Sequence, residues 1–186
     1  MCIRDRNWIG RPSVLRGSGG PVQVAPAATD DPLFDGWLRA AEQAGYPLLD
    51  DYNALSQNDQ LYGFGRSQQT ISKGRRVTAR NAYLDKIYHR KNLTILTKTK
   101  ALRIYLKKDY NGEPRVNGVE LGLANNSNAW TVEAADQIIS CAGAVMTPHL
   151  LMHSGIGPER SMRNKGIDLI VNAPGVGQNY QDHLAV

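Results

Sequence analysis

Hydrophobic and polar residues alternate in the middle of the chain, and this period of two predicts a small antiparallel sheet. Leu102, Ile104 and Leu106 alternate with polar or charged neighbours, as expected of a strand with one buried face. Asn111-Gly112 is a strong signal for a tight turn between two strands. We therefore predict a three-stranded meander with a further strand ahead of it. The extended segments expected here are 93–97, 102–106, 116–123 and 130–134.

The stretch 137–157 predicts a strand, a turn of small residues and a helix. Ile138 and Ile139 open an apolar run that is too short for a helix, which is typical of a buried strand in a covered parallel sheet. The small residues 142–144 follow at its carboxyl end. Ligands of open α/β sheets bind at that end of the strands, so small residues there leave room for a cofactor.

The helix of this stretch is expected to span about two turns. Thr147 suits the N-cap and Pro148 the first helical position, and Gly155 suits the left-handed residue that ends a helix. Cys141 falls in the predicted core, so we expect a buried, inert thiol. With Cys2 as the only other cysteine there is no disulfide framework, and a reducing compartment is the default.

The first half of the chain predicts helices joined by polar loops. Asp31 and Pro32 predict the start of a helix, and Gly45 predicts its end. The adjacent carboxylates Asp50 and Asp51 have no further ligands at fixed spacing, which favours a solvated loop over a metal or acid–base site. The other elements expected along the chain are extended pieces at 22–24, 68–71 and 167–171, a turn at 72–74, and helices at 78–88 and 159–165.

Composition places the chain among ordinary globular proteins. Its 186 residues are 41% hydrophobic and 21% charged, enough for a sizeable core. No apolar run reaches the roughly 18 residues of a membrane span, and no signal peptide is visible, so a cytoplasmic location is the default. The net charge of +5 is spread out without interleaved aromatics, which argues against nucleic-acid binding. Residues 1–6 fit no pattern and are expected to be a non-native leader.

Candidate catalytic or metal-binding residues are few. His149 and His153 have the i, i+4 spacing of a metal pair, but no third ligand is evident and no glutamate lies between them. Ser154 follows a helix, whereas a nucleophile elbow needs a strand-to-helix turn. Asp182 and His183 are adjacent and rarely would point together. We therefore assign no metal ligand and no catalytic residue from the pattern.

Taken together, the segments resemble the GMC (glucose–methanol–choline) family of flavin-dependent oxidoreductases, most closely its choline-dehydrogenase-like bacterial members. The strongest match is Gly143 to Gly157, with small residues, then Thr-Pro, two aliphatic residues and finally Ser-Gly-Ile-Gly. This pattern has many fixed positions and is specific. Supporting matches lie at 20–21, 44–47, 74–84, 92–95 and 174–183.

The resemblance implies a mixed α/β (α+β) fold made of part of a Rossmann-type FAD domain, the meander, and part of a substrate-binding domain. It implies an internal fragment, because the family's G-x-G-x-x-G fingerprint and its catalytic histidine match nothing in this sequence. The implied division has three parts after the leader. These are 7–88 on the substrate side, 89–158 in the FAD domain and 159–186 at the start of the returning substrate-domain segment.

The resemblance also implies the cofactor and its contacts. The family's backbone contact to the adenine of FAD falls on Ala101, and Cys141, Ala142 and Gly143 would lie near the ribose and the pyrophosphate. The parent enzyme would oxidise a small-molecule alcohol by hydride transfer to the flavin. The resemblance does not specify the electron acceptor that reoxidises the flavin. The isolated segment is expected to be inactive. Two alternatives remain: a catalytically inactive nucleotide-binding module, and a basic nucleic-acid-binding domain.

Overall fold

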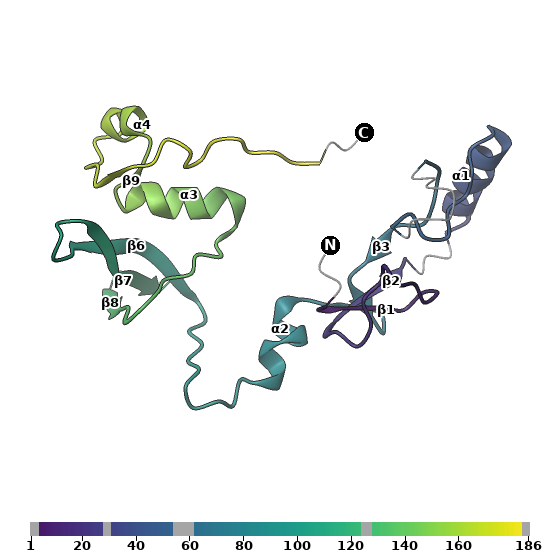
Figure 1. The fold of residues 1–186 in the computed structure, drawn as a ribbon, viewed down its shortest axis with the longest axis horizontal. Coiled ribbons are helices and arrows are strands. Elements are labelled where there is room, and N and C mark those ends of the chain that lie inside the picture. Colours follow the sequence, from purple (N-terminus) through teal and green to yellow (C-terminus); the bar gives the residue numbers. More distant parts are fainter. Residues whose placement is uncertain (1–3, 28–30, 54–61, 124–127, 184–186) are drawn as a thin grey trace. The chain divides into compact units, whose positions relative to one another are not determined.

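The computed structural model describes residues 4–27, 31–53, 62–123 and 128–183. The chain divides into two compact units between Ile95 and Leu96. Each unit has its own sheets and helices (Figure 1). We call them the N-terminal unit, up to Ile95, and the C-terminal unit, from Leu96 onward.

The C-terminal unit is built on the predicted meander. Strands β6 (Thr99–Lys108), β7 (Pro114–Leu123) and β8 (Ala129–Glu133) form an antiparallel sheet in that order, which confirms the prediction. The register between β6 and β7 shifts after Ala101, so Leu102 has no register partner in β7. The prediction of a strand at 93–97 is wrong, because these residues form coil ahead of β6. Residues 124–127, between β7 and β8, lie outside the described residues.

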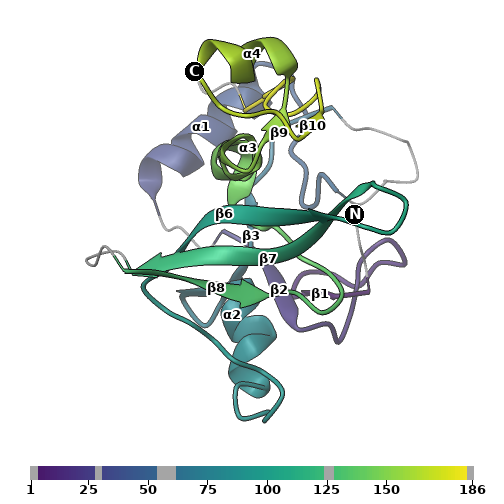
Figure 2. The ribbon, with the colours of Figure 1, turned by 90° about the vertical axis from the view of Figure 1, so that its left-hand side faces the viewer.

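Helix α3 (Gly143–His153) lies along β6, and the rest of the unit follows from its end (Figure 2). Strand β9 (Ile156–Gly157) pairs in parallel with β10 (Val171–Asn172), and α4 (Glu159–Asn164) connects them. The predicted short helix at 159–165 is confirmed, whereas the predicted strand at 167–171 shrinks to β10. The buried apolar side chains of this unit are Ile104, Leu150 and Met162.

Gly155 ends α3 in the left-handed conformation, as predicted, with a φ of +83°. A Cβ atom at this position would lie 2.7 Å from the side chain of Ile170 and 2.9 Å from the carbonyl oxygen of Asp168. Both the backbone conformation and the close approach of the returning chain therefore require glycine here.

The predictions for the start of α3 are wrong in three respects. The helix begins at Gly143, so Thr147 is not its N-cap and Pro148 lies inside it, and α3 has 11 residues where about two turns were expected. Residues 137–141 form no strand, and Ile139 is 81% exposed. A short apolar run becomes a buried strand only where partner strands flank it, and none of the described strands pairs with this one. Cys141 is consequently exposed, and the Rossmann-type part of the fold remains a prediction.

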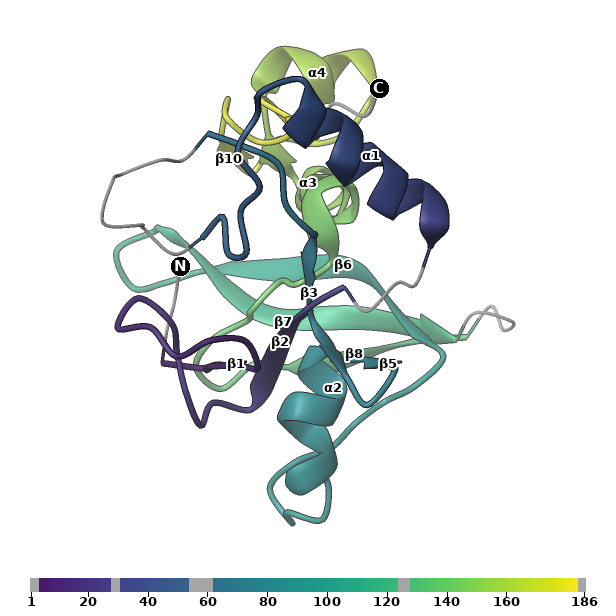
Figure 3. The ribbon, with the colours of Figure 1, turned by 90° about the vertical axis from the view of Figure 1, so that its right-hand side faces the viewer.

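The N-terminal unit consists of short strands and helices (Figure 3). Strand β1 (Arg6–Trp8) pairs in parallel with β2 (Val22–Pro26), and β3 (Gln68–Gln69) pairs with β2 in antiparallel fashion. Strands β4 (Ile71–Ser72) and β5 (Arg75–Arg76) form a hairpin around the predicted turn. Strand β1 thus begins at Arg6, the last residue of the expected leader.

The two predicted helices of this unit differ in outcome. Helix α1 (Pro32–Gln43) is confirmed: the side chain of Asp31 accepts the Leu33 N–H at 2.9 Å, and Gly45 follows with a φ of +85°. The helix expected at 78–88 is shorter, because α2 (Ala79–Ala82) ends at a residue with non-helical dihedral angles. A single 3₁₀ turn at Leu84–Lys86 then follows.

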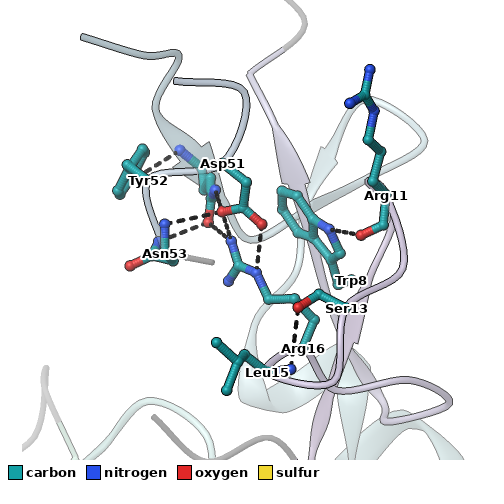
Figure 4. Close-up of polar contacts among 9 residues, drawn as sticks. Trp8, Arg11, Ser13, Leu15, Arg16, Asp51, Tyr52 and Asn53 are labelled. Atoms are coloured by element: carbon teal, nitrogen blue, oxygen red, sulfur yellow. Dashed lines mark hydrogen bonds and ion pairs between the residues drawn. The ribbon is translucent and has the colours of Figure 1, made fainter. Parts of the chain in front are cut away.

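A polar cluster joins distant parts of the N-terminal unit, and it corrects the expectation of a solvated loop at Asp51 (Figure 4). The guanidinium of Arg16 donates to both carboxylate oxygens of Asp51 and to the side chain of Gln68. The Arg16 side chain is 5% exposed and that of Asp51 16% exposed. The guanidinium carbon also lies 4.3 Å from the centroid of the Trp8 ring, a favourable cation–π geometry.

The environment of Asp51 favours its charged form. Burial raises the pKa of its carboxyl, but hydrogen bonds from Arg16, Gln68 and Asn53 outweigh that effect and hold the pKa below its ordinary value. We call Trp8, Arg16, Asp51 and Gln68 the polar cluster.

Candidate functional site

The candidate site is a pocket of about 460 Å³ between β6 and α3 in the C-terminal unit. It brings together two of the predicted cofactor-binding residues, Ala101 from β6 and Ala142 just before α3. Cys141 and Gly143 flank Ala142 in sequence but do not line the pocket. The lining residues are Thr99, Lys100, Ala101, Leu102, Ala142, Met146, His149, Leu150 and His153.

The pocket opens along the free edge of the sheet. Strand β6 is an edge strand, and the N–H of Ile104 donates to the Ser154 hydroxyl at 2.8 Å on the side away from β7. Ser154 is 1% exposed and itself donates to the Leu150 carbonyl at 2.6 Å. Ser154 therefore fixes the end of α3 to β6, which is the structural role of a residue first weighed as a nucleophile.

Backbone polar groups are available on this edge near Ala101. The shift in register leaves Leu102 without a β7 partner residue, two positions before the Ile104 N–H that points to α3. A strand edge presents N–H and C=O groups in a row, and such a row can pair with another strand or with a planar ligand that has its own donors and acceptors.

The N-terminus of α3 lies at one end of the same pocket. Ala142 occupies the N-cap position and supplies no side-chain hydrogen bond to the first helical amides. Gly143 has a φ of +87°, and a Cβ built on it would meet no atom within 4 Å. The conformation therefore requires glycine, while the space beside it is open. An uncapped helix of 11 residues carries positive partial charge at this end and favours an anionic group.

His149 and His153 form a ring pair along the pocket, a feature that the sequence suggested only as a possible metal pair. Their ring centroids are 4.4 Å apart and the planes are tilted by 34°. Among the described residues, no group of three or more His, Cys, Asp or Glu side chains could hold a metal ion. Their i, i+4 spacing indicated that the two histidines share one face of the helix. Nothing in the nearby sequence indicated that they line this pocket.

A second and larger pocket, of about 780 Å³, lies on another side of α3 and was not predicted. Its walls are α3 and the coil 176–181, and Val145 and Tyr180 give it an apolar character. Asn179 in that coil has a φ of +55°, which is uncommon for a residue with a side chain. No local pattern in this coil indicated that it would pack beside the helix.

The family assignment follows from a match that runs through this whole site. Residues 5–185 match the family model described as GMC oxidoreductase. The chain belongs to the GMC oxidoreductase family. The resemblance expected from residues 143–157 is thereby confirmed, and so is the mixed α and β composition of the fold.

Relatives cover nearly all of this chain while the chain covers a part of them. It is 42% identical over 183 residues to an oxygen-dependent choline dehydrogenase of Brucella ovis. The aligned region covers 98% of this chain and 31% of that protein. Among solved structures it resembles pyridoxine 4-oxidase from Mesorbium loti, with a TM-score of 0.77 and 31% identity over 92% of this chain and 32% of the other.

A second solved structure gives the same picture. An FAD-dependent oxidoreductase from Chaetomium thermophilum matches with a TM-score of 0.77 and 25% identity, over 93% of this chain and 31% of the other. The chain thus spans about a third of the length of the relatives it matches. None of the helices in the described parts of the chain has the length and apolar character that a membrane crossing requires.

Proposed function

We propose that this chain supplies one wall of an FAD site in an oxidoreductase that oxidises an alcohol. The observation that carries the proposal is the convergence of Ala101 and Ala142 on one pocket, from positions 41 residues apart by their numbers. Family membership and the FAD-dependent relative support the choice of cofactor. The choline dehydrogenase relatives support an alcohol substrate.

The residues present fit the adenine half of FAD. An adenine ring has an alternating donor and acceptor edge, and the free edge of β6 around Ala101 and Leu102 offers backbone groups of both kinds. Small side chains at Ala101 and Ala142 leave the pocket wide enough for a planar ring. A backbone contact of this sort tolerates any small side chain, so alanine serves at 101.

The start of α3 fits the phosphates of the same ligand. The amides that follow Ala142 have no side-chain cap, and an anion favours that end of the helix. We assign Cys141, Ala142 and Gly143 to the ribose and pyrophosphate region on this ground. Ser154 does not contact the cofactor in this proposal: it keeps α3 at the distance from β6 that the nucleotide needs.

When bound, the flavin would accept a hydride from the carbinol carbon of the alcohol. The described residues hold and orient the cofactor, and we assign none of them a catalytic role. In this proposal the N-terminal unit, within 7–88, contributes to the substrate side, and 159–186 begins the returning substrate segment. A catalytically inactive nucleotide-binding module would use the same pocket without the alcohol step.

The test compares ligands that share only part of FAD. Titration of the 186-residue chain with FAD, ADP and riboflavin, followed by calorimetry, should give binding for FAD and ADP. Riboflavin should bind at least about tenfold more weakly, because it lacks the adenine nucleotide that the pocket is proposed to contact. No alcohol oxidation is expected from the chain alone.

A matched pair of variants locates the site. Ala142→Phe should abolish FAD binding by filling the pocket, whereas Ala135→Phe, at an exposed position outside the lining, should leave it unchanged. Equal affinity for FAD and riboflavin, or equal effects of the two variants, would contradict the proposal.

A further inference from the structure

A strongly charged pocket lies in the N-terminal unit, and none of its lining residues is assigned to FAD. Its volume is about 490 Å³. Its walls come from β2, from the hairpin β4–β5 and from the α2 region. The lining includes the cations Lys73, Arg75, Arg76 and Lys86, and none of its described residues is acidic. The neutral residues of the lining are Pro21, Gln23, Ser72, Val77, Asn81 and Ala82.

The walls of this pocket are held by hydrogen bonds that do not involve the cationic groups. Lys73 and Gly74 both have positive φ values, 49° and 73°, which is the geometry of a tight hairpin turn. The Asn81 side chain caps α2 through the Thr78 N–H at 2.7 Å and also donates to the Arg76 carbonyl at 2.9 Å. The Asn81 side chain therefore joins the hairpin to α2 through the Arg76 carbonyl, and this contact does not use the guanidinium of Arg76.

The described residues do not neutralise this positive charge. No ion pair within the described parts of the chain involves any of the four cations. The nearest carboxylate in sequence, Asp85, pairs with Arg80 instead, at 3.2 Å. Four like charges around a concave surface raise the local concentration of anions.

Charge balance decides what kind of anion fits. A single phosphate group carries about −1.5 to −2 at neutral pH and would leave much of the fourfold positive charge uncompensated. Two linked phosphates come closer to balancing the charge. The two arginines offer planar guanidinium groups that bind phosphate oxygens in a bidentate manner, and the two lysines offer compact ammonium groups.

We propose that the pocket of Lys73, Arg75, Arg76 and Lys86 binds the terminal diphosphate group of a small molecule. The site does not depend on the proposed FAD pocket, whose residues all lie in the C-terminal unit. It gives the protein a second phosphate-recognising surface, with inorganic pyrophosphate as its simplest probe.

The test is calorimetric titration of the 186-residue chain with inorganic pyrophosphate, with sulfate as the comparison anion. Pyrophosphate should bind saturably and more tightly than sulfate. The double variant Arg75→Gln, Lys86→Gln should weaken binding by about tenfold or more, since each lost charge-assisted hydrogen bond contributes on that scale. Circular dichroism establishes that the variant retains its fold.

The control removes the same charge elsewhere in the same unit. Arg90→Gln, Lys91→Gln replaces two exposed cations outside the lining and should change the Kd by less than about twofold. Equal weakening in both double variants would show a general effect of net charge and overturn the proposal. Absence of saturable pyrophosphate binding would overturn it as well.

A further arm separates this site from the FAD site. FAD should not displace bound pyrophosphate from the wild-type chain, and Ala142→Phe should leave pyrophosphate affinity unchanged. Displacement by FAD would assign the cations to the diphosphate of that cofactor and would overturn the claim of a second site. Failure of FAD to bind at all would contradict only the proposed function.

Discussion

The two units of this chain are stabilised by different kinds of contact. The C-terminal unit buries Ile104 of β6, Leu150 of α3 and Met162 of α4. In the N-terminal unit the buried hydrophobic residues are the alanines Ala41 and Ala82, and the longest-range contacts are polar. One unit thus depends chiefly on apolar packing and the other on the polar cluster around Arg16 and Asp51.

Helix α1 shows the consequence for the N-terminal unit. Leu33 is 83% exposed and Trp37 64% exposed, although both are apolar and have the i, i+4 spacing of one helix face. Trp37 makes an edge contact with Phe64, with the ring centroids 6.4 Å apart. Such a unit should be sensitive to the loss of one ion pair, whereas the C-terminal unit should be sensitive to loss of packing or of a buried hydrogen bond.

The largest effect should come from Arg16→Met. It removes the cation that satisfies both oxygens of Asp51, which is 16% exposed, and it ends the contact with Trp8. Loss of one partner of a largely buried pair costs about 3 kcal/mol. Denaturant unfolding followed by Trp8 fluorescence, in a background with Trp37→Phe and Trp130→Phe, should show that loss in the N-terminal unit.

The matched control is Arg39→Met on the exposed side of α1, which should change the free energy of unfolding by less than about 0.5 kcal/mol. In a second background that keeps Trp130 and carries Trp8→Phe and Trp37→Phe, Trp130 fluorescence, which reports on β8, should be unaffected by either variant. An equal shift at Trp130 would mean that the two units unfold together and would remove the contrast between them.

The next effect should come from Ser154→Ala in the C-terminal unit. The substitution leaves the Ile104 N–H and the Leu150 carbonyl without the hydroxyl that joins them. An unsatisfied buried donor costs about 1–3 kcal/mol. Unfolding followed by Trp130 fluorescence should show the loss, and Ser161→Ala, on the exposed surface of α4, should not.

Acid should produce the smallest effect, and it should begin in the N-terminal unit. The pKa of Asp51 is lower in the folded chain than its ordinary value of 3.8. Its stabilising contribution is therefore complete above that value and is lost as the pH falls below it. Trp8 fluorescence between pH 5 and about pH 2.5 should report this loss, and Asp51→Asn should remove the pH dependence.

Asp109 in the C-terminal unit provides an internal comparison. Hydrogen bonds from the Glu113 and Asn111 amides also lower the pKa of its carboxyl. It caps the turn between β6 and β7, whereas Asp51 joins segments from opposite ends of the unit. Equal changes in Trp8 and Trp130 fluorescence on acidification would contradict the expectation that Asp51 contributes more to stability than Asp109.

Local patterns predicted the parts of the fold that depend on neighbours in sequence. Alternation around Ile104 and the Asn111-Gly112 turn were sufficient for the meander, because hairpins are local. Asp31 and Gly45 marked both ends of α1 for the same reason. Each of these signals lies within a few residues of the element it determines.

The errors concern features that depend on distant partners. Ile138 and Ile139 have the pattern of a buried strand, but burial in a sheet needs flanking strands that the local pattern does not specify. The link between Arg16 and Asp51 crosses 35 residues and is invisible to hydrophobic periodicity.

The candidate site also contains residues that could be predicted from the sequence and residues that could not. The resemblance alone suggested Ala101 and Ala142, and the structure places both on one pocket. Their role with FAD stays a prediction. Leu102 and the ring pair of His149 and His153 were missed as pocket residues, because their position follows from the packing of α3 along β6.

The hydroxyl of Ser154 also bears on how this sheet avoids self-association. A strand with an open edge can act as a template for the same strand of another molecule. By accepting the Ile104 N–H, Ser154 occupies one position at which such pairing would begin, and α3 lies over that part of the edge. A change at this serine would therefore do more than loosen a helix: it would expose a starting point for aggregation between copies of the chain.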